Sequence, residues 1–293
     1  FDKWSNDDLL VYIKGGTDDR LYAIGQLIRN GVDLALIYDK TKIDMFFLEK
    51  FKNIVEFENV VRAHPMDVET LRAAKRMGFS DKYIGQLWGL SQNEMYRLRE
   101  KNNVFPVYKM IDTCASEFAS YVPYFYSTYE EENESIVSGK EKIIVLGSGP
   151  IRIGQGVEFD YSTVHAIWSI RAAGYEAIII NNNPETVSTD YTTSDKLYFE
   201  PLTVEDVMNV IHLEKPKAIV VSLGGQTAIN LAEPLAELGV PIIGTDTQAI
   251  KNAEDRGCFE RIMEELGIPQ PEAEAVTDIE SGVRAAARIG YPV

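Results

Sequence analysis

The hydrophobic pattern of the chain changes near residue 140, and this change constrains the fold more than any other feature. Before that point, apolar residues recur three or four positions apart, which predicts helix joined to helix. After it, short runs rich in β-branched residues alternate with amphipathic stretches, a pattern typical of a mostly parallel sheet with helices on both faces. We therefore predict an α-helical domain followed by an α/β domain.

Four stretches of the first part show the helical period most clearly, and signals for helix ends accompany them. Ser91 lies three residues before Glu94, the spacing of a capping box at a helix N-terminus. Gly31 and Gly78 stand where a helix would end on a left-handed residue. The helices expected are 18–30, 44–57, 67–77 and 91–101.

The helical part also contains a weak repeat. The segments 31–51 and 78–98 carry capping and apolar residues at the same spacings. Two helical hairpins that pack on each other explain this repeat, and a self-associating interaction module is one alternative function. Another is a helix-turn-helix over 78–100 that reads DNA beside an α/β ligand-sensing domain. The net charge of -16 argues against DNA binding, because phosphate backbones bind basic surfaces.

The boundary between the two parts is a polar linker near residue 139. Before it, residues 121–129 are aromatic and include a proline, which favours an extended strap between domains over a helix. A run rich in glutamate follows over 130–134, and then a polar stretch that contains Gly139. We predict domains over 1–139 and 140–270, with residues 271–293 beginning a third domain.

Short apolar runs mark the strands of the second part. They predict strands over 143–146, 177–180, 218–221 and 241–243, with a lesser strand over 197–199. Amphipathic stretches predict helices over 163–173, 226–238, 246–266 and 277–289. Because helices separate the strands, neighbouring strands are expected to run parallel.

A glycine-rich run, GSGPIRIGQG, follows the first strand directly at 147–156. A strand followed by GxG is typical of a Rossmann-like nucleotide fold, in which glycines let the backbone approach a pyrophosphate at a helix N-terminus. Two departures argue against a dinucleotide oxidoreductase. Arg152 stands in place of the third glycine, and the second strand ends in Asn181, not in an acid that would hold a ribose hydroxyl.

Two further polar loops follow strands of the same sheet. NNNPETVSTDY at 181–191 follows the second strand, and GGQT at 224–227 follows the strand over 218–221. Carboxyl ends of parallel strands share one edge of a sheet, where α/β proteins place their ligands. We therefore expect the three loops to converge on one rim.

The sequences of these loops resemble the large chain of carbamoyl-phosphate synthetase closely. The runs are GSGPIRIGQGVEFDYSTVHA at 147–166, NNNPETVSTDYTTSDKLYFEP at 181–201 and VSLGGQTAINLA at 221–232. Upstream, TKID at 41–44 and DTCA at 112–115 resemble the helical domain between the two homologous halves of that family. The resemblance spans nearly the whole chain.

The resemblance implies a place in a larger ligase. The first domain would be an oligomerisation domain, the second the pre-ATP-grasp domain of the half that forms carbamoyl phosphate, and residues 271–293 the start of an ATP-grasp domain. The parent enzyme makes carbamoyl phosphate, for arginine and pyrimidine biosynthesis, from bicarbonate, ammonia and two ATP. A glutamine amidotransferase small subunit supplies the ammonia, and intermediates pass through an internal tunnel.

The resemblance also implies that this chain is an internal fragment without catalytic residues. The family's ATP clamp, phosphate-binding arginine and Mg²⁺-binding carboxylates match positions beyond Val293. ATP and Mg²⁺ are therefore expected in the intact enzyme and not on this fragment, which we expect to be inactive alone. Two cysteines without metal-site spacing fit a reducing cytosol, and there is no signal pattern or membrane-length apolar run, so we expect a cytoplasmic protein. The net charge of -16 argues against a nucleic-acid or membrane partner.

The three loops supply candidates for the wall that faces the ATP-grasp domain and the tunnel. Arg152 is the best candidate for contact with an anion, as a fixed cation among backbone N–H donors. An ion pair from Arg152 to Glu158, Asp160 or Glu185 is an equal alternative. The full set is Gly147, Gly149, Arg152, Gly154, Gly156, Glu158, Asp160, Asn183, Glu185, Thr186, Asp190, Gly225 and Gln226.

Overall fold

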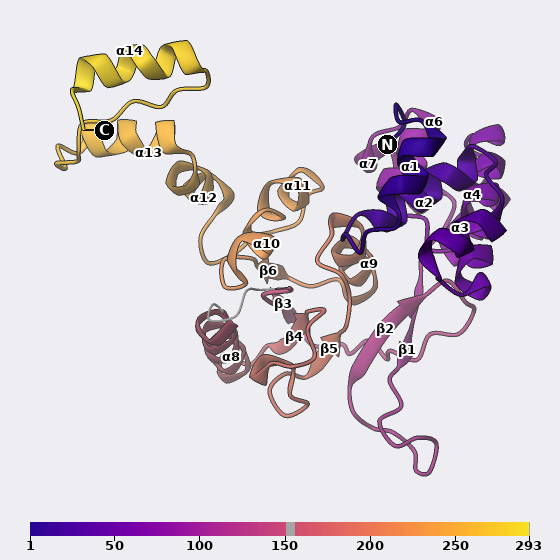
Figure 1. Ribbon diagram of the computed structural model, residues 1–293. Helices are drawn as coiled ribbons and strands as arrows, with labels where there is room; N and C mark the ends of the chain where they lie inside the picture. The colour runs from indigo at the N-terminus through magenta and orange to yellow at the C-terminus, as the bar shows by residue number, and fades with distance from the viewer. Residues whose placement is uncertain (151–155, 293) are drawn as a thin grey trace. The chain divides into compact units, whose positions relative to one another are not determined.

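The computed structural model of the chain describes residues 1–150 and 156–292 (Figure 1). The chain forms two compact units. The first is Phe1–Val107 with Thr128–Glu131, and the second is Tyr108–Ser127 with Glu132–Val293. Residues 108–127, which the sequence analysis places in the helical domain, thus belong to the α/β unit.

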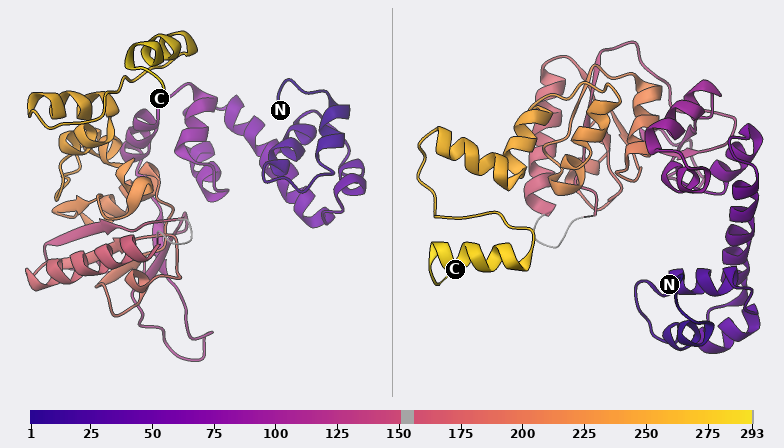
Figure 2. Two further views of the ribbon diagram at one scale, coloured as in Figure 1. Left: turned by 60° about the vertical axis from the view of Figure 1, so that its left-hand side comes forward. Right: turned by 90° about the horizontal axis from the view of Figure 1, so that it is seen from above.

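The first unit is helical, as predicted. Its longest helix, α4, contributes Leu48 and Val55 to one apolar core and Val61 to a second. Figure 2 shows α4 joining the helices before it to the helices after it. The elements are α1 (Asn6–Tyr12), α2 (Arg20–Arg29), α3 (Leu34–Thr41), α4 (Met45–Ala63), α5 (Val68–Arg76), α6 (Asp81–Trp88) and α7 (Gln92–Lys101).

The internal repeat corresponds to two helical hairpins, α3–α4 and α6–α7. In the first, Asp33 and Asp44 cap the two helices by accepting hydrogen bonds from backbone N–H groups. In the second, Ser80 and Ser91 do the same, and the Glu94 carboxylate accepts the Ser91 N–H at 2.7 Å. The predicted capping box is therefore confirmed. In both hairpins, a capping side chain explains where each helix begins.

The second unit is built on a six-stranded sheet in the order β1-β2-β5-β4-β3-β6. The pairs β2–β5, β5–β4, β4–β3 and β3–β6 are parallel, so the predicted mostly parallel α/β fold is confirmed. Every residue of β3 and β4 is buried. The strands are β1 (Val107–Met110), β2 (Tyr124–Thr128), β3 (Lys142–Leu146), β4 (Glu176–Ile180), β5 (Lys196–Tyr198) and β6 (Ala218–Val220).

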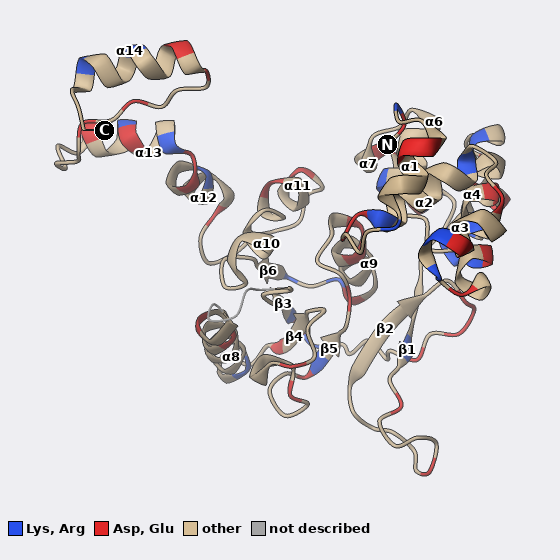
Figure 3. Cartoon of the chain, in the orientation of Figure 1, with Lys and Arg blue, Asp and Glu red and all other residues tan. Residues whose placement is uncertain are grey.

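Helices cover both faces of this sheet. Helix α8 (Gly156–Ala172) connects β3 to β4, and α9 (Val204–Glu214) connects β5 to β6 in the opposite direction across the sheet. Because parallel crossovers are right-handed, opposite directions place the two helices on opposite faces, as Figure 1 shows. Figure 3 shows charged residues mainly on helices and loops, while the strands are mostly uncharged.

Three local predictions for this unit need correction. The expected strand 241–243 is only a single parallel bridge between Ile219 and Ile242. The expected helix 226–238 is two short helices, α10 (Gly225–Ile229) and α11 (Ala232–Glu237), because Pro234 lacks the N–H that a continuous helix would need. The expected helix 246–266 breaks at Asp255, which is extended and caps the following helix.

The C-terminal part of the second unit is helical. Asp255 accepts a hydrogen bond from the Cys258 N–H at 2.8 Å, and Asp278 accepts one from the Ser281 N–H at 2.8 Å. These caps explain where two of the helices begin. The elements are α12 (Thr247–Glu254), α13 (Arg256–Glu265) and α14 (Ile279–Ile289), and a short 3₁₀ helix, η1 (Val187–Thr189), lies earlier between β4 and β5.

Candidate functional site

The three polar loops meet at the carboxyl end of the parallel strands. A Cβ atom on Gly147 would lie 2.6 Å from the Asn181 Cγ atom, so the first and second loops are in contact. A Cβ atom on Gly224 would lie 2.2 Å from the Gly147 carbonyl oxygen, so the third loop contacts the first. These approaches are closer than any side chain allows, and they require glycine at both positions.

Asn181 links the loops, and it was absent from the sequence-based candidates. Its side chain is fully buried, and Oδ1 accepts hydrogen bonds from Gly149 N at 3.0 Å and Asn182 N at 2.9 Å. Its Nδ2 atom has no hydrogen-bond partner within the described part of the chain. The signal for Asn181 was its place as the first residue after a buried strand, where a polar side chain must turn back onto backbone groups.

Two glycines of the rim have backbone angles that favour glycine. Gly149 has a φ of 62° and Gly225 a φ of 67°. A Cβ atom on Gly225 would lie 2.9 Å from Phe159 Cε2, so the third loop packs closely on α8. At these two positions glycine is favoured by the positive φ and by the close approach of a neighbouring side chain.

Asp160 holds the second loop against α8. Its carboxylate accepts hydrogen bonds from Val187 N at 2.7 Å and Ser188 N at 2.8 Å, at the start of η1. Backbone N–H groups at a helix N-terminus are the donors that a carboxylate caps best. The structure therefore gives Asp160 a structural role in joining two elements of the rim.

Three other candidates bond within the second loop. Asn183 Oδ1 accepts from Glu185 N at 3.0 Å, and Thr186 Oγ1 lies 3.0 Å from Thr189 Oγ1. Asp190 Oδ1 accepts from the Thr192 hydroxyl at 2.6 Å and from its N–H at 2.8 Å, and these bonds lower the pKa of Asp190. The loop is thus ordered by its own side chains.

The remaining candidates are exposed, line a separate cavity, or lie outside the described residues. Glu158 and Glu185 are exposed, and Gly156 begins α8. Gln226 lines a cavity of about 510 Å³ between α10, α11 and α12, and its Nε2 donates to Asn230 Oδ1 at 2.9 Å. Arg152 and Gly154 lie outside the described residues, so the contact of Arg152 stays a prediction.

The rim is made chiefly of backbone N–H groups, amides and hydroxyls. Within residues 1–150 and 156–292, no group of three His, Cys, Asp or Glu side chains is placed to hold a metal ion. In the same ranges, no helix is both long enough and apolar enough to cross a membrane. The described rim can therefore orient a polar or anionic group through its backbone N–H groups, amides and hydroxyls.

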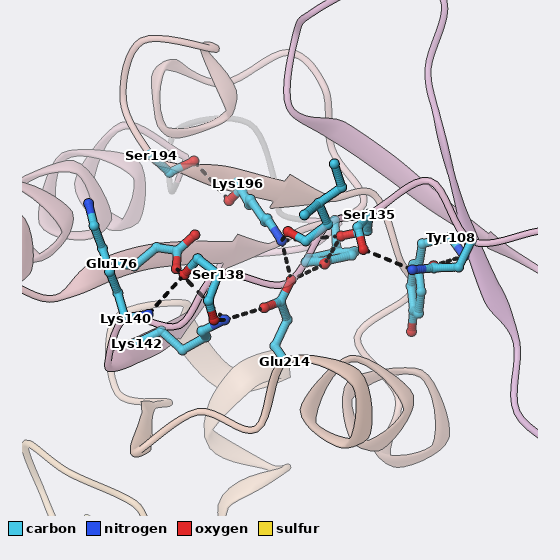
Figure 4. A network of polar contacts seen from close by, with 12 residues as sticks. Tyr108, Ser135, Ser138, Lys140, Lys142, Glu176, Ser194, Lys196 and Glu214 are labelled. Atoms are coloured by element: carbon cyan, nitrogen blue, oxygen red, sulfur yellow. Dashed lines mark hydrogen bonds and ion pairs between the residues drawn. The ribbon is translucent and has the colours of Figure 1, made fainter.

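A buried ionic network lies at the opposite, amino-terminal end of the strands (Figure 4). The Glu214 carboxylate, at the end of α9, accepts hydrogen bonds from Lys142 Nζ at 2.8 Å and Lys196 Nζ at 2.7 Å, and from the Tyr198 hydroxyl. Lys142 also lies 3.7 Å from Glu176. Because each cation has a carboxylate partner, the cluster balances its charge away from water.

The network also binds the linker that precedes β3. Lys196 Nζ donates to the Ile136 carbonyl at 2.6 Å, and Lys142 Nζ donates to the Ser138 carbonyl at 3.2 Å. The Ser135 hydroxyl lies 2.7 Å from the Tyr198 hydroxyl. Burial opposes ionisation of Glu214, but the two lysines and Tyr198 outweigh it and lower the pKa of that carboxyl.

Two family models match the chain in succession. Residues 1–103 match the oligomerisation domain of the carbamoyl-phosphate synthetase large chain, and residues 139–252 match the carbamoyl phosphate synthase preATP-grasp domain. The chain belongs to the carbamoyl-phosphate synthetase large-chain family. The resemblance predicted from the three loop sequences is thereby confirmed. The three loops lie within the matched residues 139–252, as do Lys142, Glu176, Lys196 and Glu214 of the buried network.

Solved structures to which part of the chain is similar include carboxylases and a synthetase. The biotin carboxylase domain of a thermophilic 2-oxoglutarate carboxylase is 22% identical over 52% of this chain and 34% of that chain, with a TM-score of 0.34. N5-carboxyaminoimidazole ribonucleotide synthetase from Thermus thermophilus is 17% identical over 51% and 37%, with a TM-score of 0.37. Rhizobium etli pyruvate carboxylase is 15% identical over 53% and 14%, with a TM-score of 0.39. This chain thus spans little more than a third of the length of these structures, or less.

The second unit also buries the carboxyl group of Glu200, which lies just after β5 and is held by a serine of β2. Glu200 is 3% exposed and accepts hydrogen bonds from Ser127 N at 2.5 Å and Ser127 Oγ at 2.9 Å. The pKa of Glu200 is raised to about 7, chiefly by burial and to a smaller extent by the nearby Asp206, while the hydrogen bonds from Ser127 oppose the rise. The folded protein therefore holds a proton on Glu200 over a pH range in which the unfolded chain has released it.

This raised pKa predicts a pH-dependent stability. Between the ordinary value of 4.5 and about 7 the folded state binds more protons, so the free energy of unfolding should fall as pH rises, by about 3 kcal/mol at most. Glu200→Gln preserves a neutral hydrogen-bonding group and should remove this slope. Urea unfolding of both proteins at pH 5 and pH 8 measures the difference. Equal pH dependence of the two proteins would show that Glu200 is ionised when folded.

Proposed function

We propose that this chain is part of the synthetase subunit of carbamoyl-phosphate synthetase, which makes carbamoyl phosphate from bicarbonate, ammonia and two ATP. The observation that carries the proposal is the succession of the two matched domains, oligomerisation then preATP-grasp, along one chain. A helical domain placed before a pre-ATP-grasp domain is the arrangement expected between the two halves of that subunit. The chain then belongs to the half that forms carbamoyl phosphate from carbamate.

Within that enzyme, the chain serves as a scaffold and as one wall of the reaction path. The three loops are held by Asn181, Asp160 and the close approach of Gly147 to Gly224, which makes a preorganised rim of polar groups. The Mg²⁺ and ATP of the reaction bind to ATP-grasp domains, where cations neutralise the transferred phosphoryl group. Residues 1–293 alone therefore catalyse no phosphoryl transfer.

The proposal names two kinds of protein partner. A glutamine amidotransferase subunit supplies ammonia to the parent enzyme in the cytoplasm. Self-association runs through the helical unit, and the match of residues 1–103 to an oligomerisation domain supports it. Binding of DNA by α6 and α7 has less support, because Arg99 of α7 is fully buried and pairs with Asp81 at 2.7 Å.

The parent enzyme tests the proposal directly. Carbamoyl phosphate should form from bicarbonate, Mg·ATP and either glutamine or ammonia, and Arg152→Ala should lower its output while the fold is retained. Glu233→Gln, an exposed change on α11, is the matched control and should leave the rate unchanged. A parent enzyme whose ATP turnover did not respond to bicarbonate or to ammonia would contradict the assignment.

A further inference from the structure

The outer side of α8 carries a row of exposed rings. Val157, Tyr161 and Trp168 are 79%, 65% and 53% exposed, and His165 is also exposed. The ring centres of Tyr161 and His165 lie 4.2 Å apart, and those of His165 and Trp168 lie 5.0 Å apart. We call Val157, Tyr161, His165 and Trp168 the α8 stripe.

The α8 stripe lies on the side of the helix away from the sheet. Its residues follow one another at intervals of four, four and three positions, which is the spacing of neighbours along one helix face. Val164 and Ile167 of the same helix are buried, and Ile167 packs in the core with residues of the strands. Single exposed apolar residues are normal, but rings that contact one another in a row on an outer face mark a contact surface.

A carboxylate borders the α8 stripe on the helix itself. Glu158 is exposed and lies three residues before Tyr161, so the two side chains are neighbours on the helix surface. The basic residue in the last turn of α8, Arg171, donates instead to the Thr193 carbonyl at 3.1 Å. This arginine is therefore held against the second loop, on the other flank of the helix.

A second carboxylate comes from the loop that runs beside α8. Asp160 accepts the Val187 N–H at 2.7 Å, and Arg171 binds the Thr193 carbonyl, so the segment 187–193 is fixed to α8 at both ends. The exposed Asp190 lies between these two anchor points. By helical spacing, Asp160 and Arg171 lie on the flank opposite to the first carboxylate. The α8 stripe therefore has an acidic side chain on each flank.

Exposed rings between carboxylates fit a partner that presents arginine. A guanidinium group stacks on the faces of Trp and Tyr rings and binds carboxylates through paired N–H donors. The chain makes a similar arrangement within itself, since Lys217 Nζ lies 5.2 Å from the centre of the Tyr175 ring and 2.9 Å from the Glu141 carboxylate. Arg, Trp and Tyr are also the side chains most enriched among binding hot spots.

We propose that the α8 stripe binds an arginine-bearing segment of a partner protein, with guanidinium groups stacked on Tyr161 and Trp168. Glu158 and Asp190 pair with the same groups from the two flanks. Lysine would keep the charge but would lose the planar stacking and the paired donors, so arginine should be preferred. The contact involves no step of the reaction proposed above, so it holds or fails independently of that function.

Fluorescence anisotropy of a labelled hexa-arginine peptide tests the proposal on residues 1–293, with hexa-lysine as the matched peptide. At about 0.15 M salt, which screens exposed charges beyond about 8 Å, we expect hexa-arginine to bind at least about threefold more tightly than hexa-lysine. Tyr161→Ala with Trp168→Ala removes two rings at exposed helix positions, where alanine favours the helix, so the helical circular dichroism should be retained. This variant should weaken the binding of hexa-arginine by at least about fivefold.

The control removes two exposed rings elsewhere in the second unit. Phe118 and Tyr121 are 75% and 85% exposed, and Phe118→Ala with Tyr121→Ala should bind hexa-arginine as the wild type does. Equal binding by the α8 variant and the wild type would show that the peptide follows the general negative charge, and would overturn the assignment to α8. Equal affinity of the wild type for the two peptides would overturn the preference for arginine, and no binding by the wild type would overturn the whole proposal.

Discussion

Replacing Glu214 with glutamine is expected to destabilise the second unit by about 3 to 5 kcal/mol, the loss typical of breaking a buried ion pair. Glu214 is 1% exposed and is the shared acceptor of Lys142 and Lys196, which are 3% and 7% exposed. A glutamine oxygen can accept from one lysine, but its amide N–H groups then face the other. Both lysines would then remain buried without a carboxylate at hydrogen-bond distance, and Lys142 would keep only the Glu176 carboxylate, at 3.7 Å.

Hydrogen exchange of peptides from β3 and β4 measures this effect, because both strands are fully buried and open only with the unit. The wild-type unit should also lose stability in acid, since the lowered pKa of Glu214 means that its contribution disappears as pH falls through that pKa. Glu233→Gln is the control, because the Glu233–Lys251 pair is exposed and should be worth less than about 1 kcal/mol. Equal protection in both variants would show that the network contributes little.

Replacing Gly224 with alanine is expected to cost about 3 kcal/mol, at the upper end of typical overpacking. The new methyl group would lie 2.2 Å from the Gly147 carbonyl oxygen and 2.7 Å from the Ala228 Cβ atom. A carbonyl oxygen of the backbone cannot rotate away, so the third loop must move from the first. The variant should therefore lower carbamoyl-phosphate formation in the parent enzyme as well as stability.

Gly139→Ala provides the comparison for Gly224→Ala. No atom lies within 4 Å of a Cβ built on Gly139, and alanine there should change stability by less than about 1 kcal/mol. Denaturant midpoints of the two variants and of the wild type give the result. A Gly224→Ala protein as stable and as active as Gly139→Ala would mean that the loops of the rim move freely relative to each other.

The sequence predicted those helices and strands whose positions are determined by residues close together in the sequence. Asp44 and Ser91 mark helix starts by side-chain capping, and the apolar runs of β3 and β4 mark strands buried on both faces. Convergence of the three loops follows from the same strands, because parallel neighbours end at one edge. In these cases a short stretch of sequence already contains the physical reason for the structure.

Features that depend on distant partners were missed. Lys142, Lys196 and Glu214 are separated by up to 72 residues, and each one alone is typical of a solvated surface. The buried position of Asn181 depends on a glycine on another loop, which the sequence pattern does not connect to it. Helix breaks at Asp255 and before Pro234 were also missed, because the apolar period continues through both.

Calorimetric titration of Mg·ATP tests most directly whether this chain is a scaffold and not a nucleotide site. It compares residues 1–293 with a version extended through the ATP-grasp domain of the parent. We predict measurable binding heat for the longer protein only, since the proposed function assigns the Mg²⁺ and ATP sites to the ATP-grasp domain. Tight binding of Mg·ATP by residues 1–293 alone would contradict this account and would make the glycine-rich run at 147–156 a nucleotide site in its own right.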